Sequence, residues 1–308
     1  MKSGPLANAT HALYRPRMLS RLFIILIAAQ TGLTAALPPE KNDRIDNPPW
    51  HLVDYWWDFG KDTEFKSYEV DFTLSNDVDP KVRLYIAPIG LGHLNKVPFY
   101  GGIQTQSDGY LVHPHPRRRE YIGKGAIFSR WNERDIKATR KSKGGLFESG
   151  GYEGDFISVR NKCRWIKGRY TYRIKRGKTE TINGKEHTWV EATVFSHADK
   201  KTVSIGALRF PGAKLMLGRQ LAGFIEIYGP RIPLEKIPQI TVTFEAWRIN
   251  GKAAPPQSAM AVYPRNVPQY ATSRADGKKT LGTIGAPVDR TKAKGTRQSG
   301  PNWVQQLY

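Results

Sequence analysis

Basic side chains alternate with apolar ones along the segment from Trp165 to Lys175. In a β-strand, Tyr172 and its apolar neighbours would point to one side, while Arg169 and Arg173 would point to the other. Like charges in a row repel unless an anion shields them, so the basic side is a candidate platform for an acidic polymer. The alternative is an ordinary strand with a charged, solvated outer face.

A second candidate surface combines amides with an aromatic ring. Gln104 and Gln106 alternate along one strand-like segment with Gly102 on the same side, and Trp131 ends another such segment. Sugar-binding sites stack aromatic rings on pyranose rings and hydrogen-bond the hydroxyls with amides. The alternative places the tryptophan in the core and the glutamines on a solvated face.

Two acids on one strand face could serve glycoside hydrolysis. Glu69 and Asp71 alternate in the sequence, and a retaining glycosidase needs two carboxyl groups about 5 Å apart. The next position on that face is Thr73, so the acidic triplet of the sandwich glucanases is incomplete. Two acids on a solvated strand face explain the pair equally well.

Cleavage of an acidic polysaccharide by β-elimination has other requirements. It needs a cation or amide that neutralises the uronate carboxylate, and a Tyr or His that moves the proton. The chain contains these residue types in Arg169, Arg173, Gln104, His93 and Tyr172. Because Tyr172 is expected to point inward, this reaction remains an alternative to simple binding.

Metal ligands are sparse. Glu148, Glu153 and Asp155 lie in or beside the glycine-rich loop from Gly144 to Gly154, and calcium prefers such carboxylate oxygens. The spacing matches no defined calcium loop. We therefore expect no cofactor apart from this candidate calcium site.

The body of the chain reads as short strands rich in β-branched and aromatic residues, separated by turn residues such as Asn183-Gly184. No helical periodicity interrupts them, which favours an all-β antiparallel sandwich or jelly roll. The predicted strands are Ser67–Leu74, Val82–Ala87, Phe99–Gln106, Ala126–Trp131, Tyr170–Ile174, Thr188–Phe195, Thr202–Phe210, Phe224–Tyr228 and Ile240–Ile249.

The N-terminal residues resemble an export signal. Basic residues precede the apolar run from Leu22 to Ala29, and small residues lead up to Ala36, where a signal peptidase could cut. The run is shorter than the roughly 20 apolar residues that a membrane span needs. We expect residues 1–36 to be removed, no transmembrane span in the mature chain, and a periplasmic, extracellular or cell-surface location. Met1 and Met18 are both possible start sites.

The remaining chain divides into a single sandwich domain over residues 37–250 and a basic, Pro- and Gly-rich tail over residues 251–308. With few apolar residues to bury, the tail is expected to be disordered.

Composition narrows the class of partner. The 308 residues include 48 Lys and Arg against 27 Asp and Glu, a net charge of +21 that predicts attraction to polyanions. A single cysteine excludes a disulfide framework within the chain and any Cys-rich zinc module. Because export argues against a physiological nucleic acid, we expect a glycan or another anionic polymer of the cell envelope.

Several short motifs in order resemble the domain-of-unknown-function family numbered three-four-seven-two, over Trp50 to Trp247. They are Pro98–Gln104, Gly125–Trp131, Gly151–Gly154, Trp165–Arg173 and Gly223–Tyr228. The resemblance implies a concanavalin-like sandwich in an exported bacterial protein, and it supplies no catalytic residues.

These observations together predict a glycan-binding sandwich without catalytic activity. The residues expected to contact the ligand are Gln104, Gln106, Trp131, Arg169 and Arg173. The alternative is a carbohydrate-active enzyme, a polysaccharide lyase or a glycoside hydrolase, on the same fold.

Overall fold

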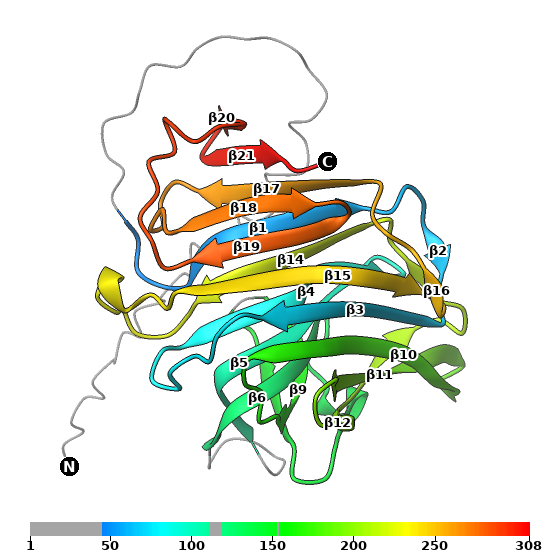
Figure 1. The fold of residues 1–308 in the computed structure, drawn as a ribbon. Helices are drawn as coiled ribbons and strands as arrows, with labels where there is room; N and C mark the ends of the chain where they lie inside the picture. The colour runs from blue at the N-terminus through cyan, green and yellow to red at the C-terminus, as the bar shows by residue number, and fades with distance from the viewer. Residues whose placement is uncertain (1–44, 111–118, 153) are drawn as a thin grey trace, which may run out of the picture.

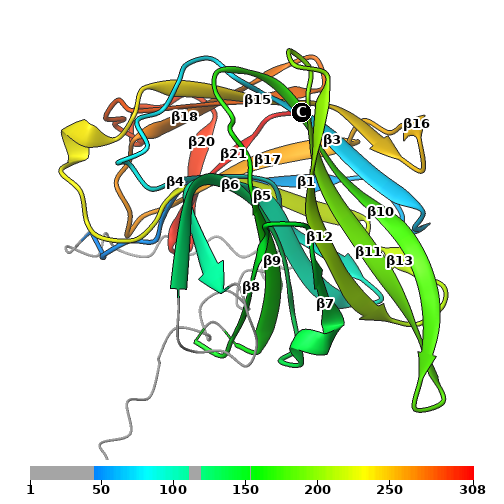
Figure 2. The ribbon, with the colours of Figure 1, turned by 90° about the horizontal axis from the view of Figure 1, so that it is seen from below.

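The structure is a computed structural model that describes residues 45–110, 119–152 and 154–308. Two antiparallel sheets pack face to face, with the smaller sheet in front in Figure 1 and the larger one behind it. Figure 2 shows the sandwich from below, with the long hairpin of strands β10 and β11 projecting at one side. The predicted antiparallel β-sandwich is therefore confirmed.

The larger sheet has the strand order β20-β21-β17-β1-β14-β4-β5-β6-β9-β8, and β8 also pairs with β5. The short strand β13 pairs with β2 and with the end of β4. Its strands are β1 (Trp50–Asp58), β2 (Thr63–Glu64), β4 (Leu84–Leu94), β5 (Val97–Tyr110), β6 (Arg119–Trp131), β8 (Leu146–Gly150), β9 (Phe156–Lys162), β13 (Met216–Leu217), β14 (Gln220–Ile227), β17 (Ser258–Pro264), β20 (Thr296–Ser299) and β21 (Asn302–Gln306).

The smaller sheet has the order β18-β19-β15-β3-β10-β11-β12-β7, with β16 paired to β15. Its strands are β3 (Ser67–Leu74), β7 (Thr139–Lys141), β10 (Gly168–Ile182), β11 (Lys185–Ser196), β12 (Lys201–Pro211), β15 (Ile240–Ile249), β16 (Lys252–Ala253), β18 (Ala271–Asp276) and β19 (Lys279–Ile284). Two short 3-10 turns, η2 (Ile136–Ala138) and η3 (Leu234–Lys236), complete the elements.

Aromatic side chains fill the space between the sheets. Trp50, Trp57 and Trp165 are at most 1% exposed, and they form one core with the inward residues of both sheets. Tyr172 also points inward, as predicted, and its hydroxyl donates a hydrogen bond of 2.8 Å to the carbonyl of Ile127 in the opposite sheet. Trp50 and Trp57 of β1 are thus core residues, which agrees with the large apolar area that buried aromatic rings contribute, whereas Trp56 between them is half-buried.

The C-terminal segment is part of the sandwich, so the prediction of a disordered tail over residues 251–308 is wrong. Strand β17 lies between β1 and β21, and β19 pairs with β15, so both sheets extend through this segment. Tyr263 is fully buried in the core. The Pro and Gly residues that suggested disorder mostly separate short strands, and two of these strands, β17 and β19, pair with strands outside the segment. The domain therefore does not end at residue 250.

The predicted signal peptide, residues 1–36, lies outside the described residues. Within the described ranges, no helix has the length and apolar character needed to span a membrane.

Candidate functional site

The five predicted contact residues do not come together. Gln104, Gln106 and Trp131 belong to strands β5 and β6 of the larger sheet, whereas Arg169 and Arg173 lie on β10 of the smaller sheet. The neighbours that alternate with them, such as Phe99, Ile103, Tyr170 and Tyr172, point into the core. The two groups therefore occupy the two opposite outer faces of the sandwich.

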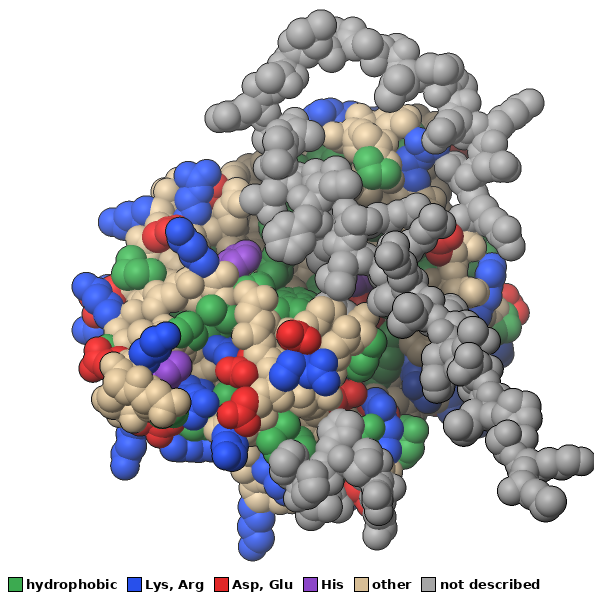
Figure 3. Space-filling view, turned by 180° about the vertical axis from the view of Figure 1, so that it is seen from behind, with side chains coloured by type: hydrophobic (Ala, Val, Ile, Leu, Met, Phe, Trp, Pro, Cys, Tyr) green, Lys and Arg blue, Asp and Glu red, His purple; other side chains and the backbone are tan. Residues whose placement is uncertain are grey.

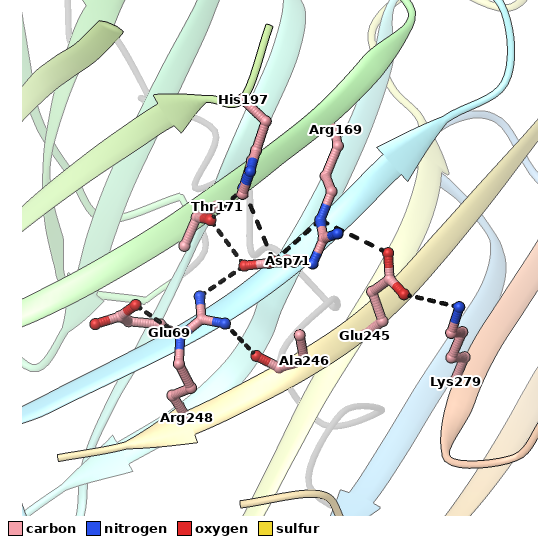
Figure 4. Close-up of polar contacts among 9 residues, drawn as sticks. All are labelled: Glu69, Asp71, Arg169, Thr171, His197, Glu245, Ala246, Arg248 and Lys279. Atoms are coloured by element: carbon pink, nitrogen blue, oxygen red, sulfur yellow. Dashed lines mark hydrogen bonds and ion pairs between the residues drawn. The ribbon is translucent and has the colours of Figure 1, made fainter. Parts of the chain in front are cut away.

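On the smaller sheet, Asp71 is the centre of a network of ion pairs (Figure 4). Asp71 is 1% exposed, and its carboxylate accepts hydrogen bonds from Arg169 Nη2 at 2.6 Å and from Arg248 Nη2 at 2.7 Å. The hydroxyl of Thr171 donates a further bond of 2.7 Å to Asp71. His197 Nε2 lies 3.8 Å from the same carboxylate. Three strands, β3, β10 and β15, are thereby joined through one carboxylate.

Glu69, two residues before Asp71, is held in the same way. Its two carboxylate oxygens lie 3.0 Å from Arg173 Nε and 2.9 Å from Arg248 Nε. Arg248 reaches both acids because β15 carries a bulge: the pairing shifts by one residue between Glu245 and Arg248, and Ala246 adopts a φ of 51°. We call this set the arginine network: Glu69, Asp71, Arg169, Thr171, Arg173, His197, Glu245, Arg248 and Lys279.

The arginine network explains the basic ladder without a ligand. Acids on β3 lie between arginines on β10 and β15, so the charges that would repel one another are shielded from within the protein. Burial of Asp71 alone would raise its pKa, but the hydrogen bonds from Arg248, Thr171 and Arg169 outweigh burial and hold the pKa of Asp71 below its ordinary value. A carboxyl group held ionised in this way cannot donate a proton as a general acid.

The outer face of the larger sheet has a different character. The strand registers align four polar side chains across neighbouring strands: His51 pairs with Glu226, Glu226 with Tyr85, and Tyr85 with Gln104. Directly paired residues point to the same side of a sheet. Figure 3 shows the molecule from this side, with hydrophobic side chains visible between clusters of basic and acidic ones.

His51 is held between two carboxylates at one end of this row. Its Nδ1 lies 2.7 Å from Asp54 Oδ1, and its Nε2 lies 2.9 Å from Glu226 Oε2. Burial alone would lower the pKa of His51, but the charges and hydrogen bonds of Asp54 and Glu226 outweigh it and raise that pKa well above its usual value. Because each ring nitrogen faces a carboxylate, both nitrogens act as donors, as they do in an imidazolium, and the ring also contacts Phe224.

A second row crosses the same face at the other end. Tyr100 pairs with Ser129, Ser129 with Ser158, and Ser158 with Glu148. The ring of Trp131 packs on Tyr100 with centroids 4.6 Å apart. We call the residues of both rows, together with Trp131, Phe224 and Arg160, the polar–aromatic face.

Arg160 lies between the two rows. It is 6% exposed, and its Nη1 is 2.6 Å from Glu148 Oε2. It also follows Ser158 by two residues on β9, so both side chains point to the same side.

Several buried polar atoms of this face find no hydrogen-bond partner among the residues that the structure describes. They include the hydroxyl groups of Tyr85 and Ser158 and the Nε of Arg160. A buried hydroxyl without a partner costs about 1–3 kcal/mol, so folded proteins rarely retain one without a reason. Their gathering on one face marks it as the best candidate site of the molecule.

The candidate calcium ligands are committed to arginines. Glu148 pairs with Arg160, and Asp155 Oδ1 lies 3.3 Å from Arg134 Nη1. Glu153 lies outside the described residues. In the described part of the chain, no three His, Cys, Asp or Glu side chains are grouped as metal ligands would be.

The other predicted residues have local roles. Gln104 accepts a hydrogen bond of 3.3 Å from Ser107 Oγ, and Gln106 Nε2 donates one of 2.6 Å to the carbonyl of Pro80. His93 lies near the far end of β4, where burial lowers its pKa. Gln104 and Trp131 are thus the two predicted residues that belong to the polar–aromatic face.

The other residues of this face could hardly be predicted from the sequence. Tyr85 and Glu226 lay within predicted strands, but nothing linked strands so distant in sequence. His51 and Arg160 belong to β1 and β9, which were not predicted.

No model of a known protein family matches the chain, and no curated protein shows significant sequence similarity to it. The resemblance to the family numbered three-four-seven-two stays a prediction.

Proposed function

We propose that the protein is an exported glycan-binding β-sandwich, and that the polar–aromatic face is its binding surface. The observation that carries this proposal is the pair of buried hydroxyl groups of Tyr85 and Ser158, which have no hydrogen-bond partner among the described residues, on the face that also holds the Tyr100–Trp131 pair. The hydroxyls of a sugar can hydrogen-bond to Tyr85 and Ser158, and its apolar ring face can stack on Tyr100 and Trp131.

The net charge adds a second, less specific contribution. Removal of residues 1–36 takes away four basic and no acidic residues, so the exported chain keeps a net charge of +17. This surplus attracts polyanions over a distance of about one Debye length, which favours an acidic polysaccharide or another anionic polymer of the cell envelope. Attraction of this kind weakens as salt increases, whereas aromatic stacking depends little on salt. The two contributions can therefore be separated by measuring binding at two salt concentrations.

A carbohydrate-active enzyme is the second candidate. One observation favours it: Tyr85, Arg160 and Gln104, a set of the types that β-elimination requires, project from one face. By contrast, the hydrolase pair Glu69 and Asp71 is locked between arginines. A lyase is thus the form of enzyme that this arrangement supports.

The test is a glycan-array screen of residues 37–308 at low and at physiological salt, with product analysis of every polymer that binds. We expect binding that persists at physiological salt and leaves the polymer intact. Trp131→Ala should weaken it at least tenfold, while Phe195→Ala, which removes a half-buried ring from the opposite outer face, should leave it unchanged. Unsaturated products would assign the lyase. Binding that disappears at physiological salt would reject glycan recognition.

Export has its own test. Mass spectrometry of the protein recovered from the medium or the periplasm should give an N-terminus at residue 37. A protein that begins at Met1 or Met18 and stays in the cytoplasm would contradict the proposed export.

A further inference from the structure

We propose that Arg160, with the hydroxyl groups of Ser158 and Tyr85, forms a subsite that recognises the carboxylate of an acidic sugar. The inference rests on the proposed function and adds to it the residues that select an acidic unit. It also moves this role from Arg169 and Arg173, where the sequence placed it, to the opposite face of the sandwich.

Arg160 has N–H donors that its ion pair with Glu148 does not use. A guanidinium carries five N–H donors, and Nη1 faces Glu148 Oε2 at 2.6 Å, while Nε has no hydrogen-bond partner within the described ranges. Glu148 does not depend on Arg160 alone, because Arg119 Nη2 lies 3.6 Å from its other oxygen and the Tyr152 hydroxyl donates to that oxygen. The ion pair therefore holds Arg160 in place without using up its hydrogen-bonding capacity.

The arginines of the opposite face lack this combination. Arg248 uses all three of its nitrogens, on Glu69, Asp71 and the carbonyl of Ala246. Arg169 and Arg173 are 44% and 50% exposed in their side chains, so water already solvates them. A buried donor without a partner gains far more from an incoming carboxylate than a solvated one does.

The neighbours of Arg160 suit a carboxylate. The hydroxyl of Ser158 lies on the same strand and side, and the charge of Arg160 acts on Tyr85 across the face. Burial, the largest influence, raises the pKa of Tyr85 well above its usual value, so its hydroxyl keeps its proton and can donate it in a hydrogen bond.

Gly109 packs closely beside the guanidinium. A Cβ at this position would lie 3.5 Å from Arg160 Nη1 and 3.0 Å from the Cβ of Leu146. A larger residue at position 109 would therefore crowd the residues that hold Arg160 in place.

The experiment compares uronic-acid polysaccharides with their carboxyl-reduced, neutral counterparts on the same array. The variant combines Arg160→Gln with Glu148→Gln, so that neither charge is left buried alone. Its control combines Arg140→Gln with Glu180→Gln, which removes an ion pair of 3.2 Å from the surface of the smaller sheet. Thermal melting of each variant confirms that it is folded.

We expect the wild-type protein to prefer the acidic member of a pair at physiological salt by at least tenfold, and the Arg160 double variant to bind both members equally. The control should keep the preference. Equal binding of both members by the wild type, or a preference that survives in the double variant, would overturn the subsite while leaving glycan binding intact. Should the double variant unfold, Ser158→Ala provides the same comparison without a change of charge. A wild-type protein that binds no glycan would reject the proposed function itself.

Discussion

Replacing Asp71 with Asn tests whether the arginine network holds the smaller sheet together. The substitution keeps the shape of the side chain and removes its charge. Asp71 accepts two charge-assisted interactions, from Arg169 and Arg248, and one neutral hydrogen bond from Thr171. Removing one partner of a buried ion pair costs about 3–5 kcal/mol.

The expected loss is smaller than that, because both arginines can turn to water. Their side chains are 44% and 28% exposed, and solvated pairs contribute little. We therefore expect Asp71→Asn to lower the free energy of unfolding by about 2–3 kcal/mol. At about 2–4 °C per kcal/mol for a chain of this size, the melting temperature should fall by roughly 5–10 °C.

The effect should also depend on pH. Because the pKa of Asp71 is lower in the folded state than its unfolded value of about 3.9, its contribution is complete at neutral pH and is lost as the pH falls through the folded pKa. Calorimetric melting curves of the two proteins, recorded from pH 7 downwards, should therefore converge in acid.

The matched control is Glu191→Gln, an exposed acid on the same face of the sheet, for which we expect a change of less than about 0.5 kcal/mol. A fall of less than 1 °C for Asp71→Asn at pH 7, or a fall of the same size at every pH, would refute this account of the network.

Three further predictions concern other parts of the molecule. Truncation after Asn250 removes β16 to β21 from the two sheets, so the shortened chain should lose its cooperative melting transition. A well-folded truncated protein would instead show that the tail is dispensable. His51→Gln should lower the melting temperature at pH 6. A histidine whose pKa is raised on folding stabilises the protein fully below its unfolded pKa of about 6.5, and this contribution disappears as the pH rises through the folded pKa. A drop in melting temperature that becomes larger toward alkaline pH would contradict an imidazolium at this position. Trp57→Phe should destabilise the protein by about 1–3 kcal/mol, since it removes an indole that donates 3.0 Å to Thr280 Oγ1 in the core, and unchanged chemical denaturation would show that this bond is unimportant.

Local patterning was sufficient for much of the fold. Strands β3 and β15 have the bounds that their alternating aromatic and β-branched residues predicted, and the hairpin at Asn183-Gly184 has the positive φ angles, 49° and 74°, of its expected turn type. The C-terminal strands were missed because they are short and rich in turn residues. Their stability comes from partners such as β1, far away in the sequence.

The candidate site was harder to predict, because it depends on register between distant strands. The row from His51 to Gln104 crosses four strands, and a slip of one residue in any of them would turn its side chain into the core. The arginine network shows the same limitation. The basic strand was evident in the sequence, but its acidic partners were not. Arg169 and Arg173 pair with acids on β3, and one of these acids, Asp71, is 98 residues away from Arg169 in the chain.

The two outer faces thus differ in how far their polar groups are satisfied. On the smaller sheet, every acid of the arginine network has a basic partner, and the arrangement is sufficient as a structural clamp. On the larger sheet, the hydroxyl groups of Tyr85 and Ser158 are buried without a hydrogen-bond partner in the part of the chain that the structure describes. Proteins often retain unfavourable groups of this kind where function needs them, at the expense of stability.

The most direct test of the central claim measures stability and glycan binding on the same variant, Tyr85→Phe. The substitution removes only a buried hydroxyl that lacks a partner among the described residues. We expect the melting temperature to rise by a few degrees, because burying the unpartnered hydroxyl costs about 1 kcal/mol. The affinity for the glycan found on the array should fall at least tenfold. A variant that gains stability and binds as tightly as the wild type would show that the hydroxyl has no part in recognition, and would contradict the assignment of this face as the binding site.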